Sequence, residues 1–594
     1  MSQSNLHAGG ARGQSRRAFL ALAAAAGAAP QVGFMPGAAA QTPAAPAVNT
    51  RGNGRPNILF VFTDQERYAR QRPPGLSLPG HERLQRTGVT FHNHYCPAVM
   101  CTSSRSVLVT GVQTPDNGMY ENCDVPWMGS LSRKVPTIGH MLRKAGYYTA
   151  YKGKWHLNKE FDTEDPERRF TKDMEAYGFA DFYGPGDIIG HTHGGYQFDH
   201  LIAGSAVTWL RRKGRPLSDG NKPWCLFVSL VNPHDVMYFN TDEPGKPVQD
   251  TGRLMMHAER APEHELYRAT WDQKLPRNLG EPFDAPGRPK AHAEFHNTWN
   301  YVLGHIPNEE ARWRRFNDYY VNCTRAVDLQ VSSLLSELDN LNLTDRTIVV
   351  FTSDHGEMAG AHGLHGKGPF VYEETTHLPF YVVHPDVRGG QDCRALTAHI
   401  DVVPTLLSMA GVGPGKSGEV AGRTLPGKDL SSVLGSPGGA DIHAARESIL
   451  FTYSGLAMND SDLWRNVDNA KAAGKNPALA LVKQGFKPDM QKRGSLRMVY
   501  DGRYKFTRYF SPLRRNSPRT LDELYRWNDV ELFDLQSDPE EMVNLAVDRE
   551  ANRDLILTMN AKLEAAIKAE IGKDDGREMP DIPFIKWTID RVDL

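Results

Sequence analysis

Short β-type runs alternate with amphipathic helical patterns from residue 56 to about residue 440. The β-type runs lie at 57–63, 147–153, 224–231, 347–353 and 378–383, and the helical patterns lie at 137–146, 327–341 and 402–411. Most of these β-type runs are apolar at consecutive positions, which is typical of strands buried on both faces. The alternation therefore predicts an α/β fold with a large, mostly parallel sheet sandwiched by helices, in one domain over residues 56–440.

The pattern changes after the Gly/Pro-rich stretch "LGSPGGAD" at 434–441. Two β-type runs flank Asp501-Gly502, which is a strong hairpin signal, and a helical pattern extends from about Asp548 to Lys573. We expect a smaller α+β subdomain with an antiparallel sheet over residues 441–594. The polar stretch at 237–312 shows no clear period and is left as loops and insertions.

The N-terminus has the pattern of an export signal. Arg16-Arg17 precede a run of about a dozen small apolar residues, which is too short to span a bilayer, and "GAAAQ" at 37–41 offers a cleavage site. The arginine pair resembles a twin-arginine signal, with an ordinary secretory signal or a disordered leader as alternatives. We expect a signal over residues 1–40, a linker over 41–55, and a periplasmic product with no membrane anchor after processing.

Charge and cysteine content exclude several classes of protein. The 69 basic and 70 acidic residues nearly cancel, so no field attracts nucleic acid or an anionic membrane, and an anionic substrate must be held locally. The six cysteines are scattered, with no CxxC pair, which excludes a disulfide scaffold and gives no sign of structural zinc. One or two disulfide bridges remain open.

Polar side chains follow three of the expected strands. Asp64 and Gln65 follow the first run, Asp354 and His355 follow the run at 347–353, and His234 follows the run at 224–231. Ligands of open α/β sheets sit outside the carboxyl ends of the strands, so we expect these residues to meet on one rim. Their donors favour Ca²⁺ or Mg²⁺, and the imidazole admits Mn²⁺. The alternative is that each Asp only caps a helix or turn.

The segment "GYYTAYKGKWH" at 146–156 adds a cation and an imidazole. If residues 153–156 are extended, Lys154 and His156 point the same way and Trp155 points the opposite way. A positive charge and a general acid or base would then share one face. The alternative is a surface lysine and a core histidine around a packing tryptophan.

Five motifs occur in an order that identifies a family. Cys101 and Arg105 begin an apolar helix that ends at Thr110-Gly111, and they lie between the Asp64 motif and "GYYTAYKGKWH", "NPHD" at 232–235 and "SDHGEMAGAHGLHGKGPFVYEE" at 353–374. This set resembles the formylglycine-dependent (type I) sulfatases of the alkaline phosphatase superfamily, over residues 56 to about 545. The resemblance implies hydrolysis of sulfate monoesters of small molecules or saccharides.

The resemblance also implies why a cysteine occupies position 101. A maturation enzyme oxidises this cysteine to formylglycine (3-oxoalanine), whose hydrate carries two hydroxyls: one attacks sulfur and the other expels the sulfate. A serine would attack as well but would leave a stable sulfate ester. The modified Cys101 is thus expected to be both nucleophile and metal ligand.

The other roles implied by the resemblance are divided between a metal site and an anion site. The metal ligands are expected at Asp64, Gln65, Cys101, Asp354 and His355 around one divalent cation, Ca²⁺, with Mn²⁺ or Mg²⁺ as alternatives. Arg105, one helical turn after Cys101, is expected to reach back to its hydroxyl, and Lys154 and Lys367 to pair with sulfate oxygens. His156 is expected to take a proton from the diol, and His234 to bind sulfate and protonate the leaving alkoxide.

Three positions depart from the usual pattern of the family. Ser103 stands where Pro or Ala is usual in the modification motif, Gln65 replaces a common second Asp, and His355 replaces a common Asn. Fewer carboxylates predict a weaker or differently selective metal site. Two other functions stay open: a phosphonate monoester or phosphodiester hydrolase with the same nucleophile, or a non-catalytic sulfate-ester binder in which Cys101 stays a thiol.

Overall fold

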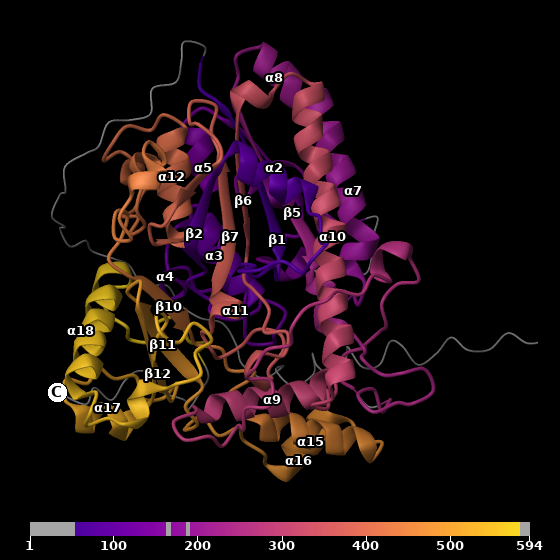
Figure 1. Ribbon diagram of the computed structural model, residues 1–594, viewed down its shortest axis with the longest axis vertical. Helices are drawn as coiled ribbons and strands as arrows, with labels where there is room; N and C mark the ends of the chain where they lie inside the picture. The colour runs from indigo at the N-terminus through magenta and orange to yellow at the C-terminus, as the bar shows by residue number, and fades with distance from the viewer. Residues whose placement is uncertain (1–53, 162–167, 186–190, 253, 582–594) are drawn as a thin grey trace, which may run out of the picture.

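A computed structural model describes residues 54–161, 168–185, 191–252 and 254–581 of the chain (Figure 1). The export signal expected over residues 1–40 lies outside the described residues.

A large sheet forms the centre of the molecule. Its strand order is β4-β3-β5-β1-β6-β7-β2-β8, with β9 paired to β2. The strands are β1 Asn57–Asp64, β2 Val89–Tyr95, β3 Tyr148–Gly153, β4 Ala180–Tyr183, β5 Trp224–Pro233, β6 Thr347–Ser353, β7 His377–Val383, β8 Gln391–Cys393 and β9 Thr397–Ala398. Neighbours from β4 to β6 pair in parallel, whereas β7 is antiparallel to both β6 and β2. The expected mostly parallel α/β sheet is confirmed.

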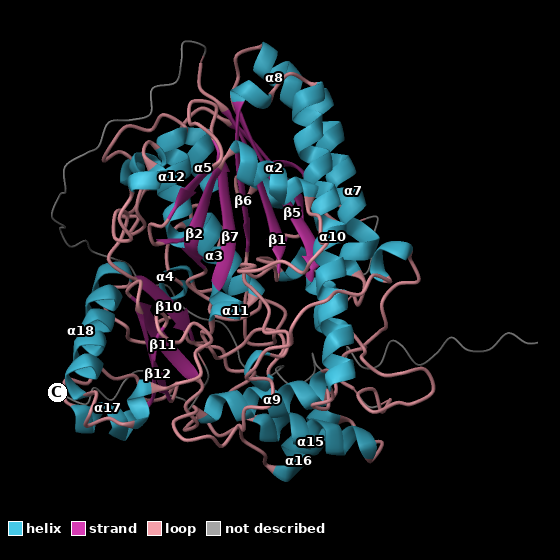
Figure 2. Ribbon diagram, viewed as in Figure 1, coloured by secondary structure: helices cyan, strands magenta, loops and turns pink. Residues whose placement is uncertain are grey.

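Helices cover both faces of this sheet (Figures 1 and 2). Alternate residues of β1 explain why: Leu59 and Val61 pack with apolar residues of α7 and α10, whereas Phe60 and Phe62 belong to the core that includes residues of α3, α5 and α12. The helices are α2 Pro79–Thr87, α3 Cys101–Thr110, α5 Ile138–Lys144, α7 Gly194–Trp209, α10 Glu310–Asn340 and α12 Val402–Met409. Helix α10 is twice as long as the pattern at 327–341 predicted.

A second, antiparallel sheet lies beside the first. Its order is β10 (Ile449–Tyr453), β11 (Ser495–Tyr500), β12 (Tyr504–Phe510) and β13 (Asp529–Asp534), and helix α18 (Arg553–Glu570) packs on it. The β11–β12 pair is the hairpin expected around Asp501-Gly502. Lys505 of β12 is buried and bonds Glu373, just before β7, at 2.8 Å, so an ion pair joins the two sheets.

Three helices gather at the end of the molecule where the site lies. Helix α9 (Lys290–Val302) contacts α15 (Ser461–Ala472), which contacts α16 (Pro477–Gln484) (Figure 1). Helix α9 belongs to the polar stretch that the sequence pattern left unassigned. In the described part of the chain, every helix is too short or too polar for a membrane span.

Candidate active site

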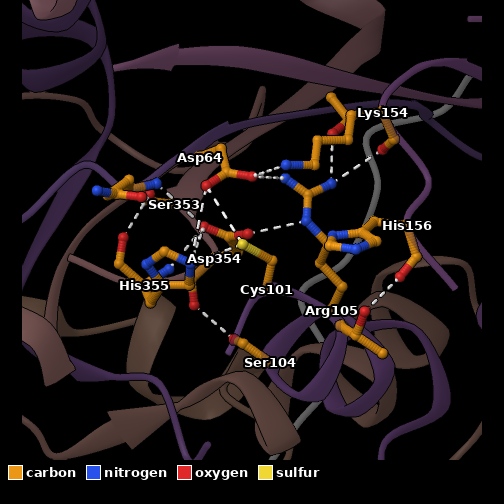
Figure 3. A network of polar contacts seen from close by, with 12 residues as sticks. Asp64, Cys101, Ser104, Arg105, Lys154, His156, Ser353, Asp354 and His355 are labelled. Carbon is orange, nitrogen blue, oxygen red and sulfur yellow. Dashed lines mark hydrogen bonds and ion pairs between the residues drawn. The ribbon is translucent and has the colours of Figure 1, made fainter. Parts of the chain in front are cut away.

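The carboxyl ends of three neighbouring strands bring the predicted polar residues together. Asp64 ends β1, Asp354 and His355 follow β6, and β1 lies between β5 and β6 in the sheet. One ligand atom from each of Asp64, Cys101, Asp354 and His355 lies within 4.8 Å of the others, and all four side chains are buried (Figure 3). Strand order therefore assembles a cluster that spans almost 300 residues of chain.

Cys101 reaches this cluster because it is the first residue of α3. Its Sγ lies 3.1 Å from Nε2 of His355 and 3.7 Å from Oδ1 of Asp64. The His355 ring is oriented by its Nδ1, which lies 3.0 Å from the carbonyl oxygen of Gly356. With Nδ1–H donated to that carbonyl, Nε2 presents its lone pair to the cluster.

Arg105 ties the cluster together from one turn further along α3. Its Nε donates to Asp354 Oδ2 at 2.8 Å and its Nη2 to Asp64 Oδ2 at 2.9 Å, while Nη1 donates to Ser229 and to the Lys154 carbonyl. The sequence led us to expect a contact with the nucleophile. The structure places the Arg105 guanidinium between the two carboxylates as a buried bracket, and the expected contact with the hydroxyl of the modified residue stays a prediction.

Lys154 lies at the cluster, but the segment around it is not extended. Strand β3 ends at Gly153, and His156 has a φ of 54°, so the expected strand-like alternation of 153–156 is wrong. Lys154 Nζ nevertheless lies 2.8 Å from Asp64 Oδ2, and Trp155 packs in the core against Tyr151. Because of this turn, the two side chains point in different directions. Lys154 faces the carboxylates, and His156 faces the pocket, where its Nε2 lies 3.4 Å from Asp124 Oδ1.

Gln65 and Lys367 meet next to the cluster. The Lys367 Nζ donates to Gln65 Oε1 at 2.5 Å, and the Gln65 side-chain amide donates to Glu357. Gln65 holds a φ of 73°, and its backbone N–H donates to Asp354 Oδ1 at 3.1 Å. Glu357 also accepts the Gly366 N–H and so shapes the loop that carries Lys367.

The charges around Cys101 favour an anion at its position. Burial and Asp64 act to raise the pKa of the thiol, but Lys367, Lys154 and His355 outweigh them and hold the pKa well below its usual value. Burial also lowers the pKa of His234, with Lys154 adding to the effect, to about 3. Nδ1 of His234 has no hydrogen-bond partner among the described residues, so this buried atom is left for a ligand.

The donor set fits a divalent cation. Oδ2 of each carboxylate is bonded to Arg105. Oδ1 of Asp64 and Oδ1 of Asp354 face the cluster, 3.7 and 3.6 Å from Nε2 of His355. Burial and the nearby Asp64 raise the pKa of Asp354, so two buried carboxylates share a small volume. A cation held by oxygen atoms and one imidazole nitrogen would stabilise both.

A pocket leads to Cys101 from the side of α9 and α15. Its lining residues are Met100, Cys101, Glu121, Asn122, Asp124, Val125, His156, His234, Met237, Tyr238, Met256, Trp299, Val302, Lys367, Ala457, Met458 and Trp464. Four predicted residues, Cys101, His156, His234 and Lys367, thus share one pocket.

Most of the other lining residues could not be identified from the sequence because they belong to no motif. Two nearby histidines, His362 and His365, are buried outside the pocket lining: His362 stacks on Tyr372, and His365 packs against Trp313.

Comparison with known proteins agrees with this site. The alkaline-phosphatase-like fold is shared with solved sulfatase structures, and the sulfatase family model matches residues 56–412. The chain belongs to the sulfatase family, and its class of activity is the hydrolysis of sulfuric esters.

Two relatives and one solved structure illustrate the similarity. The N-acetylglucosamine-6-O-sulfatase of Bacteroides thetaiotaomicron is 28% identical, with 60% of this chain and 68% of the relative covered. The choline-sulfatase of Rhizobium meliloti is 27% identical with the same coverage. The phosphonate monoester hydrolase of Silicibacter pomeroyi has a TM-score of 0.60 at 18% identity, covering 87% of this chain and 96% of that one, which shows the shared fold.

Proposed function

We propose that the chain hydrolyses sulfate monoesters with Cys101, oxidised to formylglycine, as the nucleophile. The observation that carries the proposal is the position of Cys101 Sγ, 3.1 Å from His355 Nε2 at the floor of the pocket and beside two buried carboxylates. After oxidation, a hydroxyl oxygen takes the place of that sulfur. The low pKa of the thiol supports the proposal, because the same cations would stabilise an anionic oxygen.

The residues that would hold the metal are Asp64, Asp354 and His355, with the oxidised residue 101 as a further ligand. Gln65 would join them through its Oε1, which accepts from Lys367 Nζ in the structure. Three or more oxygen donors and one nitrogen favour Ca²⁺, with Mn²⁺ or Mg²⁺ as alternatives. A bound cation supplies a Lewis acid that polarises sulfuryl oxygens and lowers the pKa of the attacking hydroxyl. Arg105 holds both carboxylates in place from behind.

The anion site is completed by residues of the pocket floor. Lys154 and Lys367 lie where their charges would meet the sulfuryl oxygens, and they act in a buried site where electrostatic attraction is strong. His234 is neutral near pH 7 by its low pKa and has a free Nδ1 position, which suits a hydrogen bond to substrate and proton transfer to the leaving oxygen. His156 would accept the proton that is released when the diol collapses.

Mass spectrometry of the Cys101 peptide tests the proposal. We expect a fraction of the peptide to carry formylglycine, and specific activity to rise in proportion to that fraction across preparations, because only the oxidised residue turns over. Ser103 in the modification motif makes incomplete conversion the expected state. Full activity in material whose Cys101 is entirely a thiol would overturn the nucleophile assignment.

A phosphonate monoester or phosphodiester hydrolase is the second candidate, since a protein of that activity shares the fold. The two are separated by kcat/KM on an aryl sulfate and an aryl phosphodiester with the same leaving group. We expect the sulfate to be preferred. A higher kcat/KM for the phosphodiester would instead support the second candidate function.

The N-terminal sequence supports two further proposals, one on when Cys101 is oxidised and one on where the protein is located. Arg16-Arg17 suit export of an already folded chain, so a maturation enzyme would oxidise Cys101 in the cytoplasm before export to the periplasm. Replacing both arginines with lysine should keep the protein in the cytoplasm with formylglycine already formed. Cytoplasmic protein with an unmodified Cys101 would contradict this order.

A further inference from the structure

The pocket above Cys101 is lined on one side by apolar side chains. We define the apolar wall as Met237, Met256, Trp299, Val302, Met458 and Trp464, which come from the loops and helices around α9 and α15. Long and aromatic side chains of this kind provide a large contact area for an apolar group. The wall is therefore the part of the pocket that the alcohol portion of a substrate would touch.

Most polar groups in and beneath this wall are already used inside the protein, and the exception is the buried indole Nε1 of Trp299, which has no hydrogen-bond partner among the described residues. The indole Nε1 of Trp464 donates to the Ala457 carbonyl at 2.7 Å. Glu121 accepts the backbone N–H groups of Leu456 and Ala457 at 3.1 and 2.9 Å, and the indole N–H of Trp127 at 2.7 Å. These polar groups fix the wall and are not left to bind the hydroxyls of a sugar.

The charges along the pocket disfavour a second anionic group on the substrate. Among the lining residues in the described part of the chain, Lys367 is the one lysine or arginine, and it lies on the floor bonded to Gln65. The acidic lining residues are Asp124 and Glu121, and burial raises the pKa of Glu121 to about 7. A carboxylate or second sulfate on the alcohol would face carboxylates without a matching cation.

We propose that the preferred substrate is the sulfate ester of an aryl or long-chain alkyl alcohol, and that anionic saccharide sulfates are poor substrates. The inference rests on the proposed function, since the wall matters only if a sulfate ester binds on the floor. Apolar pockets gain affinity from each buried methylene, whereas a polyanionic sugar must lose its hydration without new partners.

The test compares three esters of primary alcohols, so that the leaving groups are similar in reactivity. They are 3-phenylpropyl sulfate, N-acetylglucosamine 6-sulfate and glucosamine 2-N,6-O-disulfate, assayed by sulfate release on one preparation with a measured formylglycine fraction. We expect kcat/KM for the phenylpropyl ester to exceed that of each sugar by about tenfold or more. Equal or higher values for either sugar would overturn the inference while leaving the proposed function intact.

Two pairs of variants test the wall itself. Trp464→Ala should lower kcat/KM for the phenylpropyl ester by about tenfold, and Trp464→Phe should lower it less because the aromatic ring remains. Met256 is only half-buried, so Met256→Lys can place an ammonium in the pocket and Met256→Gln serves as its uncharged control. The lysine variant should raise kcat/KM for the disulfate several-fold relative to the glutamine variant.

The two failures are distinguishable. No change in relative rates with Trp464→Ala and Met256→Lys, in variants that unfold at the wild-type temperature, would show that the wall does not touch substrate and would overturn the inference. Failure to release sulfate from any of the three esters, with Cys101 fully oxidised, would overturn the proposed function and with it this inference.

Discussion

The floor and the wall of the pocket are built on different principles. The floor comprises Cys101 and Lys367, which line the pocket, and the residues behind them, Asp64, Arg105, Lys154, Asp354 and His355. It is held by ion pairs between side chains that are nearly fully buried. The apolar wall is held by packing and by the hydrogen bond from the Trp464 indole to the Ala457 carbonyl. The floor lies within the family-matched residues 56–412, whereas Met458 and Trp464 of the wall lie beyond them.

This difference separates chemistry from specificity. Charged groups on a rigid sheet edge keep their geometry because each is bonded to several others, so moving one disturbs all. In the proposal above, wall residues act mainly through contact area, so a change in one of them should alter which alcohol binds without altering how sulfate is cleaved. Variants of the floor should therefore affect all esters alike, and variants of the wall should affect only some.

The largest expected effect comes from Cys101→Ser. Compared with the proposed formylglycine hydrate, this variant keeps an attacking oxygen but lacks the second hydroxyl that would release sulfate. It should therefore lose multiple turnover on every ester while keeping its fold and metal binding. Steady-state sulfate release measures the loss of multiple turnover. The mass of the protein after exposure to substrate shows whether the serine has attacked and kept the sulfate. Sustained turnover by the serine variant would show that the floor works by another nucleophile.

Lys367→Ala should have the next largest effect. Removal of a preorganised cation from a buried anion site should lower kcat by roughly two to three orders of magnitude on apolar and sugar esters alike. Lys222→Ala, at an exposed position, is the matched control and should keep full activity. A loss confined to one class of ester would place Lys367 in the wall rather than in the floor.

The floor could be predicted from the sequence more completely than the wall. Asp64, Asp354 and His234 follow apolar runs, and the strand-end rule alone placed them on one rim. The partners of Arg105 were not predictable because Asp354 is almost 250 residues away, and the turn at His156 depends on a positive φ that no local pattern signalled. The wall has no motif, since Trp299 and Trp464 become neighbours of the site only through the packing of α9 on α15.

His81→Gln tests whether a buried positive charge behind the floor stabilises the fold. His81 Nε2 lies 2.8 Å from Glu66, next to Gln65, and its Nδ1 lies 2.5 Å from Asp328. Burial acts to lower the pKa of His81, but Glu66 and Asp328 outweigh it and raise the pKa to about 9. The charged imidazole thus stabilises the fold fully below about pH 6.5, and this contribution is lost as pH rises through 9.

The difference in unfolding free energy between wild type and His81→Gln should follow that window. Denaturant unfolding should give at most about 3 kcal/mol of difference at pH 6 and a smaller one above pH 9, the scale of a pKa raised from 6.5 to about 9. A difference that stays constant from pH 6 to 9 would mean that His81 acts through packing alone.

Glu121→Gln should have the smallest effect, and it tests most directly where the floor ends and the wall begins. Glu121 accepts three N–H donors, two of them from the backbone at Leu456 and Ala457, and burial raises its pKa to about 7. An amide has only one acceptor oxygen, and its NH₂ group would face N–H donors, so the variant should lose about 1 to 2 kcal/mol of stability and loosen the loop beneath Trp464.

The loosened loop should raise KM for 3-phenylpropyl sulfate by about fivefold, equivalent to about 1 kcal/mol, while kcat changes little because the floor keeps its geometry. Because its pKa is raised in the folded state, the wild-type carboxyl stabilises the fold most below about pH 4.5, and that contribution falls as pH rises through 7. The difference in unfolding free energy between wild type and Glu121→Gln should therefore become smaller as pH rises from about 4.5 to about 7. A fall in kcat equal to the rise in KM would show that this glutamate supports the reacting groups, and the boundary between floor and wall would have to be moved to include it.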